Sequence, residues 1–147
     1  MCCVDAFAGT GALGFEAASR GAAQVLLVER EGALVEQLQR VSAQLQALVM
    51  TPPVAPQRLL IQRGEGVAAL RQLAPASQQV IFIDPPFDGD LYEAALSAAA
   101  RAIAPTGWVY LEAPKAWTDA VLNPLGWAVH RHLKAGAVHA HLLRRVD

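Results

Sequence analysis

Four consecutive residues, Asp84, Pro85, Pro86 and Phe87, combine a carboxylate, two rigid rings and an aromatic side chain. They follow the apolar run 80–83, which predicts a buried strand. Proline fixes φ and has no N–H, so its carbonyl is offered without a competing donor. A carboxylate and a carbonyl can hold an amino group while the ring stacks on a flat ligand. The four residues are therefore a candidate catalytic ledge; a Pro-rich turn with Phe87 in the core is the alternative.

A second candidate site is the glycine-rich run 5–14, which ends one predicted strand and begins a helix. Gly9, Gly11 and Gly14 fit G-x-G-x-x-G, a pattern that lets a cofactor approach the backbone. A dinucleotide would place its pyrophosphate at this helix N-terminus. Asp5, however, would repel a pyrophosphate and attract a cation. The pattern therefore favours S-adenosylmethionine, which carries an ammonium and a sulfonium; the alternative for Asp5 is a turn or helix cap.

Two further acids end predicted strands. Glu29 is placed to accept ribose hydroxyls from either cofactor, or to be a solvated charge. Glu65, with the N–H of Gly66, could contact an adenine ring, or Glu65 could be the acid of a helix N-terminus. The predicted cofactor-binding residues are Asp5, Phe7, Ala8, Gly9, Thr10, Gly11, Glu29, Arg30, Glu65 and Gly66.

Composition predicts one globular domain over residues 1–147, because 54% of the residues are hydrophobic and 17% are charged. The net charge of −1 provides no global attraction to nucleic acid. The only cysteines, Cys2 and Cys3, are adjacent, which argues against a disulfide framework. With no signal peptide or membrane span visible, the expected location is the cytoplasm.

Apolar runs alternate with helical patterns through most of the chain, which predicts a doubly wound α/β sheet. Helices are expected at 12–19, 32–49, 67–73 and 91–103. Strands are expected at 2–7, 25–28, 59–62, 80–83, 108–111, 129–133 and 138–143. The last two strands are joined by only four residues, so they must be antiparallel. The predicted architecture is a mostly parallel seven-stranded sheet that ends in an antiparallel hairpin, with the candidate residues at one edge.

The run from Asp5 to Ala22 resembles motif I of the RsmD-like 16S rRNA guanine-N2 methyltransferases. Asp84-Pro85-Pro86-Phe87 is similar to the catalytic motif IV of that family, and the hairpin around residues 134–138 also resembles its final hairpin. The resemblance implies a Rossmann-like class I methyltransferase fold, S-adenosylmethionine as cofactor, and a guanine of 16S rRNA, within a small-subunit particle, as substrate. It implies no metal and no membrane.

The chain departs from the family pattern in two places. Family members carry an N-terminal segment before motif I that contributes to RNA and cofactor binding. In this chain the predicted first strand starts almost at Met1, so we expect that this extension is missing. The last strand of the family often carries a tyrosine, where this chain has Ala140 or His141.

The alternative functions are a methyltransferase acting on DNA adenine, another RNA or protein glutamine, and a cofactor-binding fragment without activity. A nucleotide-dependent oxidoreductase fits the glycines but neither Asp5 nor the ledge.

Histidines and basic residues gather near the C-terminus. His132 is expected opposite His139, and His130 opposite His141, which would place four imidazoles on one strand face. Such a face could bind a metal, although a plain polar face is favoured because methyl transfer needs no metal. Arg131, Lys134, Arg144 and Arg145 are interpreted as a solvated face, with phosphate contacts as the alternative.

Overall fold

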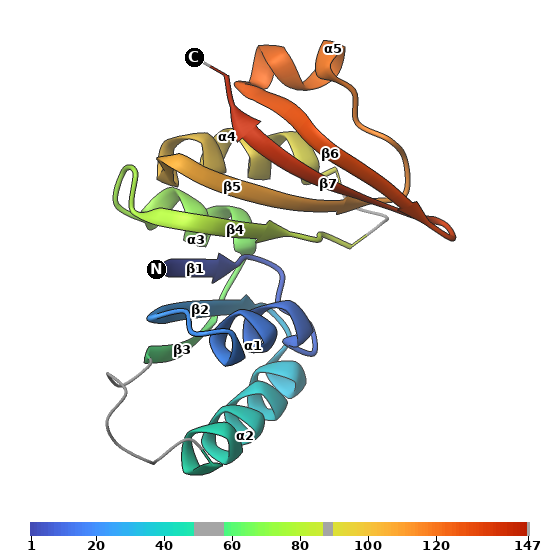
Figure 1. Cartoon of the computed structure of the whole chain (residues 1–147). Helices are drawn as coiled ribbons and strands as arrows, with labels where there is room; N and C mark the ends of the chain where they lie inside the picture. Colours follow the sequence, from blue (N-terminus) through green and yellow to red (C-terminus); the bar gives the residue numbers. More distant parts are fainter. Residues whose placement is uncertain (49–57, 87–89, 147) are drawn as a thin grey trace.

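The computed structural model in Figure 1 describes residues 1–48, 58–86 and 90–146. Its strands form one sheet in the order β3-β2-β1-β4-β5-β7-β6. Strands β1 to β5 are parallel, whereas β7 pairs antiparallel with β5 and with β6. The strands are β1 (Cys2–Asp5), β2 (Gln24–Glu29), β3 (Arg58–Arg63), β4 (Gln78–Ile83), β5 (Ile103–Ala113), β6 (Trp127–Ala135) and β7 (Val138–Arg145). The predicted fold class is confirmed.

Helices connect the parallel strands and cover both faces of the sheet. They are α1 (Ala12–Ser19), α2 (Gly32–Leu48), α3 (Gly66–Gln72) and α4 (Tyr92–Ala102), followed by the short α5 (Asp119–Leu122) and the 3₁₀ turn η1 (Asn123–Leu125). The first four match the predicted helices within one residue at each end, except that residue 49, the predicted end of the second helix, lies outside the described residues. Helix α5 is a single turn and too short for a periodic pattern. None of the helices in the described ranges is long and apolar enough to cross a membrane.

Successive residues of the central strands point into two separate cores. Cys3 packs in the layer that contains Ala18 of α1 and Leu38 of α2. Val4 packs on the other side, with Leu70 of α3 and other buried residues of α3 and α4. Alternate side chains of a strand face opposite ways, so a sheet covered by helices on both sides needs strands that are apolar at every position. The continuous apolar runs of the sequence have this physical cause.

The fifth strand is longer than predicted, running over Ile103–Ala113 rather than 108–111. Pro105 and Gly107 resemble turn residues, but the strand passes through them with a shift of register against β4. A Cβ atom on Gly107 would lie 2.8 Å from the carbonyl oxygen of Gln79. Glycine is therefore needed here for close strand contact and does not mark a turn.

The C-terminal hairpin projects past the sheet on the side where the parallel strands end (Figure 1). Its register differs from our expectation: Ala135 pairs with Val138, and His132 pairs with His141 rather than with His139. The predicted register is wrong because the turn contains only Gly136 and Ala137 between paired residues.

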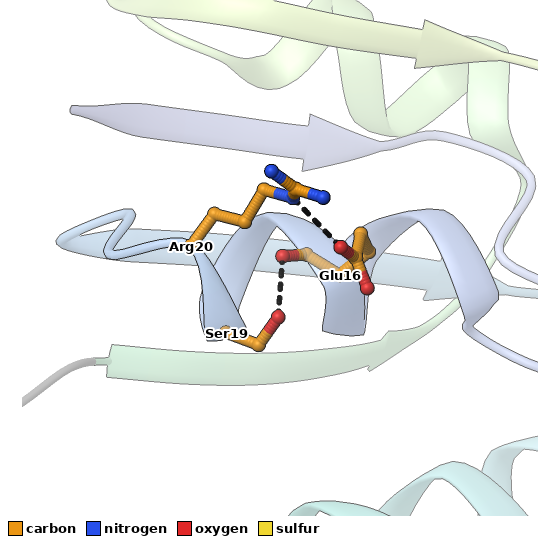
Figure 2. Close-up of polar contacts among 3 residues, drawn as sticks. All are labelled: Glu16, Ser19 and Arg20. Carbon is orange, nitrogen blue, oxygen red and sulfur yellow. Dashed lines mark hydrogen bonds and ion pairs between the residues drawn. The ribbon is translucent and has the colours of Figure 1, made fainter.

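The far end of α1 is closed by local contacts between three exposed residues, shown in Figure 2. Arg20 Nε lies 2.7 Å from Glu16 Oε1, and the Ser19 hydroxyl donates to the carbonyl of Glu16 at 2.9 Å. An exposed ion pair of this kind contributes at most about 1 kcal/mol. The candidate cofactor site lies at the opposite end of α1, where the glycine loop leads into the helix.

Candidate functional site

A cavity of about 630 Å³ opens at the carboxyl ends of the first four strands. This volume is typical of small-molecule and cofactor sites, and its position is where open α/β sheets bind ligands. The predicted residues that line it are Asp5, Phe7, Ala8, Gly9, Thr10, Glu29, Arg30, Glu65, Gly66, Asp84, Pro85 and Pro86. The structure therefore brings the glycine loop and the ledge together around one space. Phe87 lies outside the described residues, and its stacking role stays a prediction.

The glycine loop is anchored to β2 by its backbone. Ala8 N–H donates to the carbonyl of Val28 at 2.8 Å, and Gly11 N–H donates to the carbonyl of Ala8 at 2.8 Å. Gly9 has φ of +56°, and a Cβ atom there would meet nothing within 4 Å. The left-handed conformation and the open space mark Gly9 as the point where a ligand can approach the backbone.

Gly11 is not among the residues that line the cavity, so its predicted contact with the cofactor stays a prediction. Its φ is +87°, and a Cβ atom would lie 2.6 Å from Leu38 Cδ2 and 2.7 Å from Phe15 Cδ2. Gly11 therefore lets α1 begin close to α2 and the Phe15 ring. The motif residue serves packing, and the loop before it faces the cavity.

Glu29 ties the end of β2 to the glycine loop. One carboxylate oxygen accepts the Gly9 N–H at 3.1 Å, and the other accepts the Glu31 N–H at 2.8 Å. Each carboxylate oxygen has two lone pairs, so both retain capacity for a further donor such as a ribose hydroxyl. The structure thus adds an anchoring role to the binding role predicted for Glu29.

Asp5 is a buried carboxylate at the bottom of the site. Only 1% of the residue is exposed, and its Oδ1 atom has no hydrogen-bond partner. Burial raises the pKa of Asp5 to about 7, although the backbone N–H groups of Phe7 and Gly14 oppose that rise. An isolated buried carboxylate is costly unless an opposite charge accompanies it. The cavity therefore has a built-in preference for a cationic group near Asp5.

Gly66, at the start of α3, packs directly against the backbone that follows β1. A Cβ atom there would overlap the carbonyl oxygen of Ala6 and would lie 2.8 Å from Phe7 Cε1. Glu65 precedes it as the N-cap, with extended backbone and no side-chain capping bond. The Glu65 side chain is therefore not used to cap α3, which leaves it available to a ligand in the cavity.

Gly66→Ala is expected to destabilise the fold by about 1–3 kcal/mol, because the added methyl group must push backbone away from backbone. The matched control is Gly64→Ala, where the nearest atom to an added Cβ is Gln62 Nε2 at 3.8 Å. The control should change stability by less than about 0.5 kcal/mol. Urea denaturation of both variants measures the difference. Equal stability of the two variants would contradict the close contact between α3 and the backbone that follows β1.

Asp84 stands at the end of β4, followed by Pro85 and Pro86, and all three line the cavity. Its pKa is raised to about 6, first by burial and then by the charge of Glu112, with which it shares a side-chain hydrogen bond. Glu112 lies on β5 and accepts a hydrogen bond of 2.8 Å from the Tyr110 hydroxyl.

The sequence interpretation missed Glu112 and Tyr110. A signal was present, since Glu112 directly follows a predicted strand, as Glu29 and Asp84 do at theirs. Strand ends of a parallel sheet lie at one edge, so the same rule would have placed Glu112 at the edge that holds Asp84, although not beside it.

The electrostatic balance of the cavity is acidic. The acidic residues lining it are Asp5, Glu29, Glu31, Glu65 and Asp84, and the basic one is Arg30. Such a lining repels a pyrophosphate and favours a ligand that carries positive charge. The chemistry of the described lining thus agrees with the expectation drawn from Asp5.

The histidine cluster lies on the hairpin and not in the cavity. His132 Nε2 is 2.8 Å from His139 Nδ1 with the rings stacked, whereas His130 lies against Trp108 instead. The buried His141 uses Nε2 to accept the Trp117 N–H and Nδ1 to contact the carbonyl of Leu111. In the described part of the chain no group of three or more His, Cys, Asp or Glu side chains is arranged to hold a metal ion.

The basic C-terminal residues do not form one patch. Arg144 stacks on Trp108 at 4.5 Å, and Arg145 lies over Trp127 and donates to the carbonyl of Gly126. Both lie at the end of the hairpin remote from the cavity, because they pair with the start of β6. Lys134, near the hairpin turn, is at the cavity's edge of the sheet.

Comparison with known proteins gives concordant similarities. The sequence profile of a family described as "Conserved hypothetical protein 95" matches residues 1–144. The chain is 32% identical to ribosomal RNA small subunit methyltransferase D of Escherichia coli K12, over 97% of this chain and 68% of that protein. The protein of the same name from Haemophilus influenzae is 31% identical, over 95% of this chain and 69% of that protein.

Solved structures share the fold. The E. coli protein yhhF, described as a methyltransferase candidate, superposes with a TM-score of 0.79 at 31% identity, over 98% of this chain and 75% of that one. A Burkholderia thailandensis N1-methyltransferase, solved with S-adenosylhomocysteine, gives a TM-score of 0.74 at 11% identity, over 99% of this chain and 71% of that one. The second likeness concerns the fold alone.

Proposed function

This chain belongs to the family described as "Conserved hypothetical protein 95", and we propose that it transfers a methyl group from S-adenosylmethionine to the N2 amine of a guanine in small-subunit (16S) rRNA. The observation that carries the proposal is one acidic cavity bordered by two features: the carboxylate of Asp5, whose Oδ1 atom has no hydrogen-bond partner, and the ledge of Asp84, Pro85 and Pro86. The names of its curated relatives support an RNA substrate.

The cavity's residues fit S-adenosylmethionine better than a dinucleotide. Asp5, whose Oδ1 lacks a partner, would hold the ammonium group of the cofactor. Glu29 would accept the ribose hydroxyls, and Glu65 with the Gly66 N–H would contact the adenine. When bound, the cofactor supplies a methyl group made electrophilic by its positive sulfur. The acidic lining, with Arg30 as its basic member, would oppose the pyrophosphate of NAD.

The ledge would orient the acceptor amine. The lone pair of guanine N2 is delocalised into the ring, so the amine is a poor nucleophile. Asp84 and the carbonyl of Pro85 would accept its two hydrogens and turn the lone pair toward the methyl group. Alignment of this kind can contribute about 7–11 kcal/mol to a reaction. Asp84 would also stabilise the positive charge that develops on nitrogen, and Phe87 would stack on the base, which is worth about 1–3 kcal/mol.

A guanine in structured RNA must leave its stack before it can reach this ledge. The net charge of −1 gives the chain little general attraction to RNA, so recognition would depend on local contacts. We propose that residues 1–147 act as one methyltransferase catalytic domain and that the substrate is the rRNA within a small-subunit particle.

The test is a transfer assay with S-adenosylmethionine labelled in its methyl group. The chain is incubated with naked small-subunit rRNA and with small-subunit particles, and the RNA is digested to nucleosides. Label in N2-methylguanosine is the expected result. Label in methyladenosine, or in protein, would redirect the proposal to another amino group. Calorimetry with S-adenosylmethionine and with NAD completes the test, and binding of NAD alone would overturn the cofactor assignment.

A further inference from the structure

Two carboxyl groups meet at the ends of β4 and β5. Ile83 pairs with Leu111, so Asp84 and Glu112 are the next residues on adjacent parallel strands. Their side chains are close enough to share a hydrogen bond, which requires a proton between two acids. Burial raises the pKa of Asp84, and the nearby charge of Glu112 raises it further, because the Asp84 carboxylate is formed against an existing negative charge.

Tyr110 fixes the orientation of this pair. It lies two residues before Glu112 and therefore on the same face of β5. Its hydroxyl donates to Glu112 Oε1 at 2.8 Å, and its ring packs edge-on against Phe82 at 6.0 Å. Burial, followed by the bond to Glu112, raises the pKa of Tyr110 to about 12. Tyr110 is thus a protonated donor near neutral pH, and its hydroxyl occupies one oxygen of Glu112.

The other titratable groups that act on the pair come from two further elements. Asp5 of β1 feels the charges of Asp84 and Glu112, and Tyr92 of α4 feels that of Asp84. These groups are carboxyl or phenol, so neither can neutralise the pair. A proton is the simplest species that relieves the repulsion between Asp84 and Glu112.

We propose that Glu112 is a positioning residue of the methyl-acceptor site, which Tyr110 holds beside Asp84 so that the two carboxyl groups together take the proton released by the acceptor amine. The inference rests on the proposed function, because it assumes that Asp84 holds the amine. As the N–CH₃ bond forms, the S–CH₃ bond breaks and its electron pair stays on sulfur. The amine nitrogen, now positive, then loses an N–H proton to Asp84, which is ionised above about pH 6, and keeps that bond's electrons. The pair later releases the proton to water.

The first experiment needs neither cofactor nor RNA. Carbon-13 NMR follows the titration of the Asp84 carboxyl in the full chain, with its resonance identified by its loss in Asp84→Asn. In Glu112→Gln, which keeps the side-chain shape, the apparent pKa of Asp84 should fall, because the repelling charge is gone while burial remains. Tyr110→Phe is a second variant, which should change the same titration because it frees Glu112. Glu36→Gln, an exposed residue of α2, is the control and should change nothing.

The second experiment is the pH dependence of methyl transfer. Glu112→Gln should lower kcat by about 10–100-fold, near or below the usual range for a positioned proton acceptor. The acid limb of its kcat profile should move to lower pH, and its affinity for S-adenosylmethionine should stay within about threefold of the wild type. A merely structural role for Glu112 would not move the acid limb.

The outcomes separate the two proposals. An unchanged Asp84 titration in Glu112→Gln, or an acid limb at the wild-type pH, overturns the shared proton. A wild-type chain that transfers no methyl group to RNA overturns the proposed function, and with it the source of the proton. The expected shift of the Asp84 titration would still support the pairing of the two carboxyl groups in that case.

Discussion

Asp84→Ala lowers kcat for methyl transfer by about 10²–10³-fold in the expected result, while the affinity for S-adenosylmethionine stays within about threefold. The magnitude is that of losing one fixed group that stabilises charge in a transition state. The carbonyl of Pro85 remains and can hold only one of the two amine hydrogens. The amine then loses the alignment that makes its lone pair reactive.

Stability provides the control for this experiment. Burial raises the pKa of Asp84 to about 6, so its carboxylate is a group that the folded state disfavours. Its removal should leave the free energy of unfolding at neutral pH unchanged or slightly higher. A measured stability in this range would show that the loss of activity is not caused by unfolding. Glu36→Ala, on the exposed face of α2, should retain full activity. An Asp84→Ala protein with near wild-type kcat would remove Asp84 from the mechanism.

The fold could be predicted because its physical causes are local in the sequence. A sheet covered on both faces requires apolar strands. The helices begin shortly after the residues that end the strands, as the glycine loop does before α1. The four-residue link before Val138 forced an antiparallel pair. Two predictions were wrong because they depend on a neighbouring strand. The length of β5 depends on its contact with β4, and the register of the hairpin places His132 opposite His141.

The site was predicted as a set of residues but not as an electrostatic system. The carboxyl-end rule brought Asp5, Glu29 and Asp84 to one cavity. The sequence does not show which hydrogen-bond partners a buried side chain finds, so it could not reveal that Asp5 has an oxygen without a partner. It also could not reveal that Glu112 acts on Asp84, because that contact depends on which strands are neighbours.

Asp5→Asn should stabilise the chain above neutral pH and weaken its binding of the cofactor. Burial raises the pKa of Asp5 to about 7, well above that of an exposed aspartate. The folded state therefore binds more protons than the unfolded state between about pH 4 and pH 7. Stability must fall as the pH rises through this window and level off above it. Each pKa unit corresponds to about 1.4 kcal/mol, so removal of the charge should add about 2–4 kcal/mol near pH 8.

The measurement is urea denaturation of wild type and Asp5→Asn at about pH 4.5, 6 and 8. The difference between the two reports the Asp5 charge together with its interaction with Asp84 and Glu112, because the more distant titrating groups are the same in both. It should be small at the lowest pH and largest at the highest.

The same carboxylate should matter to the ligand in the opposite sense. A cation that binds Asp5 favours its ionised form, so S-adenosylmethionine should bind more tightly to the wild type as the pH rises through about 7. Asp5→Asn should bind it about 10–100-fold more weakly, the cost of losing a charged hydrogen-bond partner, with little dependence on pH. Equal pH profiles of stability for the two proteins would contradict the buried charge. Equal affinities would contradict its role in binding. Together, the stability profiles and the affinities decide whether Asp5 destabilises the fold and strengthens cofactor binding.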